Sequence, residues 1–97
     1  MTPLGRQVRA GLTALADPAK AGPMQAYMKS AMPFLGVSAV PLREMCKNLF
    51  ANLRYESAEA WQGDVLSLWR NARFREERYV AIALTGLRAA QIGRAHV

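Results

Sequence analysis

The sequence predicts an all-α protein built from about five antiparallel helices. Apolar residues recur at intervals of three and four positions, which is the spacing of one helix face, and no segment alternates apolar and polar residues as a half-buried strand would. Prolines and glycines cluster at the ends of these periodic runs, where they would end one helix and start the next.

Two helices are expected in the first third of the chain. The first has an apolar stripe that another element must cover, made of Leu4, Val8, Leu12 and Leu15. Asp17 followed by Pro18 is a helix start signal, because aspartate accepts hydrogen bonds from free amides and proline suits the first helical position. A second helix from Pro18 to about Ser30 aligns four residues on one side: Ala21, Met24, Tyr27 and Met28.

Three more helices follow a short apolar connection at Pro33–Val37, whose Phe-Leu pair is expected to pack on its neighbours. Pro41 is expected to open the third helix, with a buried stripe of Leu42, Met45, Cys46, Leu49, Phe50 and Leu53. Ser57 is the expected cap of the fourth helix. Its buried side comprises Trp61, Val65, Leu68 and Trp69. The fifth helix follows Arg73, with Tyr79, Ile82, Ala83, Gly86 and Leu87 in register.

Composition restricts the classes of function that the chain can serve. At 97 residues it forms one domain at most, and its 13 basic against 7 acidic residues favour phosphate polymers or anionic surfaces as partners. Cys46 is the only cysteine, which excludes an internal disulfide and a thiolate metal cluster and fits a reducing cytoplasm. No apolar run is long enough to span a bilayer.

Two helical architectures fit these lengths: a HEAT-like or armadillo-type superhelix, and a plain helical bundle. An array needs a capping unit, and the fifth helix would keep one face uncovered, so residues 1–91 are expected to be the N-terminal part of a longer repeat domain. Residues 92–97 equal the translation of a common sequencing-adapter read and are interpreted as an artefact, the alternative being a genuine C-terminus.

Two blocks of sequence resemble the AlkD-like DNA alkylation repair family. The first contains a Met-x-x-Tyr-Met-Lys helix at 24–29, a Phe-Leu-Gly turn at 34–36 and a Pro-x-Arg helix start at 41–43. The second contains Leu68-Trp69 and the segment 75–79, followed by an Ala-rich helix. Together they cover most of residues 5–91. The chain departs from the family pattern at Val40, where a capping residue is expected.

The resemblance implies a HEAT-like superhelix whose concave basic surface holds duplex DNA. It further implies a DNA glycosylase that excises cationic alkylated purines such as 3-methyladenine and 7-methylguanine, without cofactor or metal, as a monomer in the cytoplasm near the nucleoid. The family's catalytic aspartate lies beyond this chain, so no catalytic residue is assigned and the fragment is expected to be inactive. The alternatives are a non-catalytic nucleic-acid-binding module and a basic protein-interaction domain.

Four residues are the candidate DNA contacts. Tyr27 is expected either near the lesion or in the core, and Lys29, Arg43 and Lys47 are expected either on phosphates or on a solvated helix face. Arg43, Lys47 and Arg54 are placed on one stripe of the third helix. Other conspicuous side chains are interpreted structurally: Trp61 and Trp69 as core, Cys46 as an inert thiol, and Glu76 and Glu77 as surface partners of nearby arginines.

Overall fold

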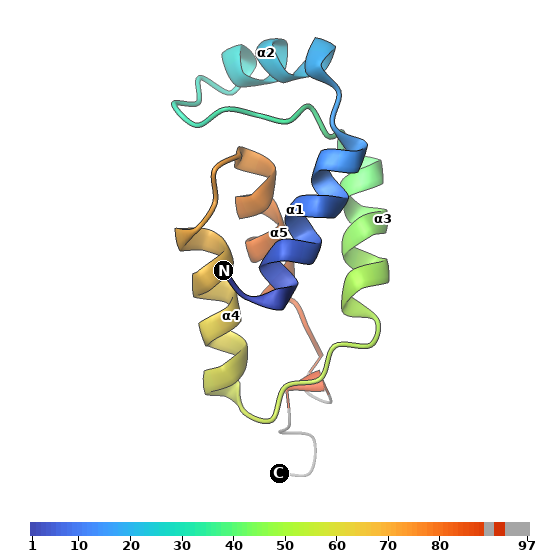
Figure 1. Cartoon of the computed structure of the whole chain (residues 1–97), viewed down its shortest axis with the longest axis vertical. Coiled ribbons are helices and arrows are strands. Elements are labelled where there is room, and N and C mark those ends of the chain that lie inside the picture. Colours follow the sequence, from blue (N-terminus) through green and yellow to red (C-terminus); the bar gives the residue numbers. More distant parts are fainter. Residues whose placement is uncertain (89–90, 93–97) are drawn as a thin grey trace.

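The all-α prediction is confirmed by the computed structural model, which describes residues 1–88 and 91–92 (Figure 1). This part of the chain holds five helices and no strand: α1 (Pro3–Leu15), α2 (Pro18–Tyr27), α3 (Ala39–Phe50), α4 (Ala58–Arg70) and α5 (Arg75–Leu84). Of the C-terminal segment interpreted as an artefact, Ile92 is buried, and residues 93–97 lie outside the described residues. None of the helices described is long and apolar enough to cross a membrane.

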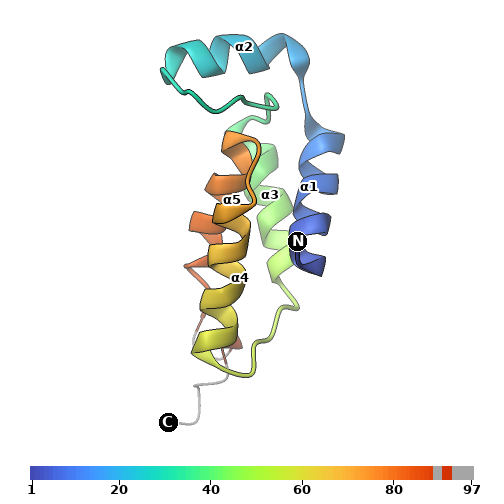
Figure 2. The same ribbon diagram turned by 60° about the vertical axis from the view of Figure 1, so that its left-hand side comes forward.

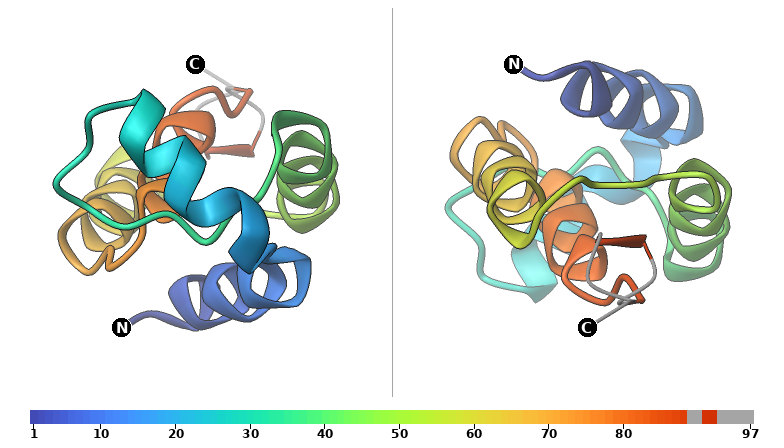
Figure 3. Two further views of the ribbon diagram at one scale, coloured as in Figure 1. Left: turned by 90° about the horizontal axis from the view of Figure 1, so that it is seen from above. Right: turned by 90° about the horizontal axis from the view of Figure 1, so that it is seen from below.

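The helices form two antiparallel pairs, α1 with α3 and α4 with α5, which is consistent with a helical repeat arrangement (Figures 1 and 2). Seen along the helix axes, α5 lies among α1, α3 and α4 and packs against all three (Figure 3). Helix α2 crosses one end of the pairs, and no Cα of α2 lies within 8 Å of a Cα in another helix. The molecule is therefore a four-helix body with one separate helix across its end.

Local capping explains where three of the helices begin. The Asp17 carboxylate accepts a hydrogen bond from the Ala19 amide at 3.0 Å, and the Ser57 hydroxyl accepts one from the Ala60 amide at 3.1 Å. Both predicted start signals are thus confirmed. Thr2 caps α1 in the same way through the Gly5 amide at 3.0 Å.

Three predicted helix boundaries were wrong. Helix α2 ends at Tyr27 rather than near Ser30, because Lys29 adopts a left-handed backbone with φ of 51°. Helix α3 begins before Pro41, which a first turn tolerates because the amide there needs no partner within the helix. It ends at Phe50, so Arg54 lies in the following loop and not on a stripe of the helix.

The core lies where α1, α3, α4 and α5 meet. Its buried members are Leu4, Val8 and Leu12 of α1, Val37 of the loop before α3, Cys46 and Phe50 of α3, Leu68 of α4, and Val80, Ala81 and Leu84 of α5. The stripe predicted for α5 was displaced: Ile82 is 56% exposed, and the buried face begins instead with Glu76 and Glu77. The predicted and observed faces differ because Glu76 and Glu77, predicted to lie on the surface, are buried.

Glu76 is fully buried and holds the loop between α2 and α3. Its carboxylate accepts hydrogen bonds from the amides of Leu35 at 2.9 Å, Gly36 at 2.9 Å and Val37 at 3.0 Å. Burying a carboxylate is costly unless hydrogen bonds replace its water shell, and here three backbone donors do so.

Glu77 is 2% exposed and joins α1 to the start of α5. Its Oε2 accepts from Nε and Nη2 of Arg9 at 3.2 and 2.9 Å, in a two-pronged ion pair. Its Oε1 accepts from the amides of Arg73 and Phe74, which precede the helix and would otherwise lack partners. The two carboxylate oxygens of Glu77 together fix the N-terminal end of α5.

Gly36 makes the close approach of the loop to α2 possible. Its φ of 88° is in the left-handed region, and a Cβ built there would lie 2.0 Å from the Asp17 carbonyl oxygen. The Asp17 amide donates to the Leu35 carbonyl oxygen at 3.0 Å, so the two backbones run in contact. Any side chain at 36 would force them apart.

Substituting Gly36→Ala is expected to lower the free energy of unfolding by about 3 kcal/mol or more, because both the backbone angle and the Asp17 carbonyl oppose a Cβ. The control is Gly63→Ala within α4, where nothing lies within 4 Å, which is expected to gain about 0.5–1 kcal/mol. Urea unfolding of both variants measures the difference. Equal stabilities would contradict the tight loop.

The Cys46 thiol is predicted to be unreactive in the folded protein. Burial raises the pKa of the thiol from its ordinary value to about 11, so little thiolate forms near neutral pH. Because the folded pKa is raised, the thiol's contribution to stability is complete below pH 9 and is lost between pH 9 and 11. Labelling of the thiol by a disulfide reagent should be slow until urea unfolds the chain. In Cys46→Ala, the free energy of unfolding should fall less between pH 9 and 11 than in the native chain. Fast labelling of the native chain would refute the burial.

Candidate nucleic-acid interface

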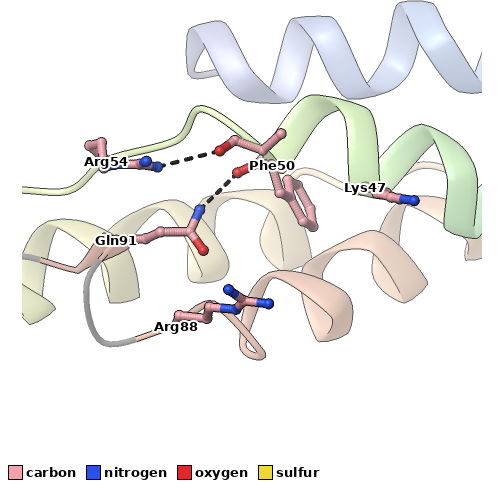
Figure 4. Close-up of a pocket in the computed structure, with 6 residues that line it drawn as sticks. Lys47, Phe50, Arg54, Arg88 and Gln91 are labelled. Carbon is pink, nitrogen blue, oxygen red and sulfur yellow. Dashed lines mark hydrogen bonds between the residues drawn. The ribbon is translucent and has the colours of Figure 1, made fainter.

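Three cations surround one pocket of about 400 Å³ at the C-terminal end of α3. Lys47 comes from α3, Arg54 from the loop that follows it and Arg88 from the segment after α5 (Figure 4). Phe50, Ala51 and Gln91 complete the lining. We call this the basic pocket.

The frame of the basic pocket is held by hydrogen bonds between distant segments. The Gln91 side-chain amide donates to the carbonyl oxygen of Phe50 at 2.9 Å (Figure 4). It also donates to that of Leu53 at 3.2 Å. Its backbone carbonyl accepts from the Tyr55 amide at 2.7 Å. The Arg54 guanidinium donates to the Leu53 carbonyl oxygen at 2.7 Å, which fixes its stem beside the pocket.

No carboxylate lines the basic pocket. Within residues 1–88 and 91–92, the one ion pair closer than 4.0 Å joins Arg9 and Glu77, so the pocket cations have no such partner there. Lys47 also lies in the last turn of α3, where a cation offsets the negative end of the helix dipole. The remaining positive charge faces solvent and attracts anions.

An apolar hollow of about 460 Å³ lies between α2 and the start of α5. We call it the aromatic hollow; its lining is Pro23, Met24 and Tyr27 of α2, Met28 just after that helix, Phe34 of the loop and Tyr79 of α5. Tyr27 is 85% exposed, so the core interpretation of this residue was wrong. The reason is that α2 stands apart and buries none of its residues.

The floor of the aromatic hollow is better packed than its α2 side. Phe34 is buried and meets Tyr79 edge-to-face, with ring centroids 6.2 Å apart and an interplanar angle of 63°. The Arg75 guanidinium lies 5.7 Å from the centre of the Tyr79 ring. The hollow therefore combines flat apolar faces with a nearby positive charge, which suits a planar ligand bearing anionic groups.

The four predicted contact residues fall into two separate groups. Tyr27 and Lys29 lie at the C-terminal end of α2, whereas Arg43 and Lys47 lie one turn apart on α3, away from that end (Figure 1). All four side chains are exposed. The structure brings Lys47 together with Arg54 and Arg88 instead, and the sequence could not show this because Lys47 and Arg88 are 41 positions apart.

The two tryptophans of α4 have different surroundings. Trp61 is half-buried and its indole Nε1 donates to the Leu84 carbonyl oxygen at 2.9 Å, tying α4 to α5. Trp69 is 40% exposed and lies under the Arg78 guanidinium, 4.5 Å from the ring centre. The prediction that both are core residues was therefore wrong for Trp69, which lies at the edge of the α4–α5 contact, beside a shallow hollow that it shares with Leu66 and Ile82.

Cys46 is buried as predicted and lies apart from both sites. Across the residues that the structure describes, no group of three His, Cys, Asp or Glu side chains is placed to hold a metal ion. What the two sites offer is positive charge and aromatic surface, which are the two components of nucleic-acid recognition.

Comparison with known proteins agrees with this chemistry. No curated protein matches the chain. The family model described as DNA alkylation repair enzyme matches residues 8–95, which is nearly the whole chain and includes both sites. The chain therefore belongs to the DNA alkylation repair enzyme family.

Proposed function

We propose that this chain is the DNA-contacting part of a DNA glycosylase that excises cationic alkylated purines, such as 3-methyladenine and 7-methylguanine, from duplex DNA. The observation that carries the proposal is the family match over residues 8–95. Two stacked helix pairs, as in the N-terminal part of a HEAT-like array, support it. We propose a monomer that acts in the cytoplasm beside the nucleoid and uses no cofactor.

The chemistry of such a lesion sets what the protein must supply. Alkylation at a ring nitrogen leaves the base positively charged, so it departs without strong general-acid help. What needs stabilising is the positive charge that develops on the sugar, and a carboxylate near the sugar does this electrostatically. Aromatic faces beside a cationic base add about 1–2 kcal/mol and discriminate against neutral bases.

The carboxylates of this chain are not placed for that role. Asp17, Asp64, Glu76 and Glu77 are engaged in hydrogen bonds within the protein. Glu44, Glu56 and Glu59 are exposed, and no acidic residue lines the basic pocket or the aromatic hollow. We therefore propose that these 97 residues alone bind DNA without cleaving the glycosidic bond. The same observation favours the second candidate, a non-catalytic nucleic-acid-binding module.

In this proposal the two sites contact DNA in different ways. Lys47, Arg54 and Arg88 contact backbone phosphates, which supply affinity without sequence preference. Tyr27 presents its ring at the aromatic hollow, near the lesion, where stacking on a base or sugar is available. Arg43 is an exposed cation one turn before Lys47 on α3 and extends the phosphate-binding surface there, whereas Lys29 is an exposed cation beside the aromatic hollow.

Removing the charge of the basic pocket is expected to weaken DNA binding and its salt dependence. The triple variant Lys47→Gln, Arg54→Gln, Arg88→Gln should lower the slope of log K against log salt by about 2–3, roughly 0.9 per lost phosphate contact. Fluorescence anisotropy with a labelled duplex measures this. The control Arg70→Gln, Arg73→Gln removes exposed charge outside both sites and should change the slope far less. Equal slopes for the triple variant and the native chain would refute the phosphate contacts.

Methylated duplex DNA tests the catalytic part of the proposal. The 97-residue chain is expected to bind the duplex yet release 3-methyladenine only at the rate of spontaneous depurination, because no carboxylate faces either site. Chromatography of released bases provides the measurement, with an established alkylpurine glycosylase as the positive control. Release above the protein-free background would show that the chain carries its own catalytic group.

A further inference from the structure

Helix α2 is placed by its connections rather than by packing. It buries none of its residues and approaches no other helix within 8 Å between Cα atoms. Yet it carries Tyr27 on the rim of the aromatic hollow, opposite Tyr79 of α5. Because α2 has no interface with another helix, its contacts and hydrogen bonds with the neighbouring loop must fix it relative to the four-helix body.

The N-terminal end of α2 is tied to α5 through Glu76. The Asp17 amide, at the cap of α2, donates to the Leu35 carbonyl oxygen at 3.0 Å. The amide of the same Leu35 and those of Gly36 and Val37 all donate to the Glu76 carboxylate. Two short hydrogen-bonded steps thus connect the start of α2 with the first turn of α5.

The C-terminal end of α2 is tied to the neighbouring residue, Arg75. The Arg75 guanidinium donates to the Ser30 hydroxyl at 3.2 Å, and the Arg75 amide donates to the Pro33 carbonyl oxygen at 2.9 Å. Ser30 is in turn bonded to the last turn of α2, because its amide donates to the Gln25 carbonyl oxygen and its carbonyl accepts from the Gln25 side chain, both at 3.1 Å.

We infer that Arg75 and Glu76 are positioning residues that together hold both ends of α2 and thereby present Tyr27 to DNA; the DNA part of this inference rests on the proposed function. The two residues are consecutive and belong to α5, the helix that packs against α1, α3 and α4. Both ends of α2 are therefore held against the same turn of one helix. Burying a full carboxylate is a poor way to gain stability, since apolar packing achieves as much without desolvating a charge. Its use here is explained by the need to place a helix that has no core of its own.

Spin labels on α2 and α3 test the positioning without DNA. Labels at Ala26→Cys and Asn48→Cys, both exposed positions, are placed on a Cys46→Ala background, and the distance distribution between them is measured by pulsed electron resonance. The distribution is expected to be narrow in the parent and to broaden with Glu76→Gln, because the amide group cannot accept from three donors at once. The control Val8→Ala weakens the core and should leave the distribution narrow.

A double-mutant cycle tests the link to DNA. With a fluorescent methylated duplex as the probe, Tyr27→Ala and Glu76→Gln should each weaken binding about fivefold, and the double variant should be no weaker than the poorer single variant. Glu76→Gln combined with Lys47→Gln should instead show multiplied losses, because the basic pocket is built without α2. Should Glu76→Gln fail to fold, Ser30→Ala replaces it, since it removes the hydrogen bond from the Arg75 guanidinium, together with those between Ser30 and Met32, and leaves Glu76 in place.

Each outcome decides the inference. A broadened distribution with coupled losses for Tyr27 and Glu76 supports it. An unchanged distribution, or multiplied losses for Tyr27 and Glu76, overturns it, as does native affinity in either single variant. If the native chain fails to bind duplex DNA, the proposed function falls, and the spin-label distances alone decide whether Arg75 and Glu76 place α2.

Discussion

The rest of the molecule depends on the Glu76 carboxylate and the three amides that surround it. The loop between α2 and α3 belongs to neither helix, so its amides need partners from elsewhere once they are buried. Glu76 supplies those partners from the first turn of α5, and the loop in turn brings Phe34 and Val37 into the core. A single side chain therefore satisfies the backbone of one segment and fixes its position on another.

Glu77, in the same turn of α5, binds α1. Its ion pair with Arg9 holds α1, so two adjacent carboxylates connect α5 with both the first helix and the loop that supports the second. Helix α5 is accordingly the centre of the fold, and the two candidate sites lie at its two ends. The basic pocket is formed where the chain leaves α5, and the aromatic hollow where α5 begins. In this way the arrangement that stabilises the helices also places the surfaces proposed to contact DNA.

Features set by neighbouring residues were predictable from the sequence, and features set across the fold were not. The caps at Asp17 and Ser57 depend on amides two or three positions away, and both predictions are confirmed. The burial of Glu76 depends on amides about forty positions away, so the local run of two glutamates between arginines at 75–78 indicated a surface instead. Tyr27 illustrates the same limit, because its apolar stripe predicts a buried face only if another helix covers it. The family was recognisable because its motifs are local, whereas the joining of Lys47 with Arg88 is not.

The free energy of unfolding of Glu76→Ala, compared with Glu59→Ala, tests this account most directly. Glu59 is an exposed residue in the first turn of α4, so its loss should cost at most about 1 kcal/mol. Removing Glu76 leaves three loop amides without their acceptor and should cost about 3 kcal/mol or more, or abolish cooperative unfolding altogether. Equal losses for the two variants would show that the buried carboxylate is not the interaction on which this fold depends.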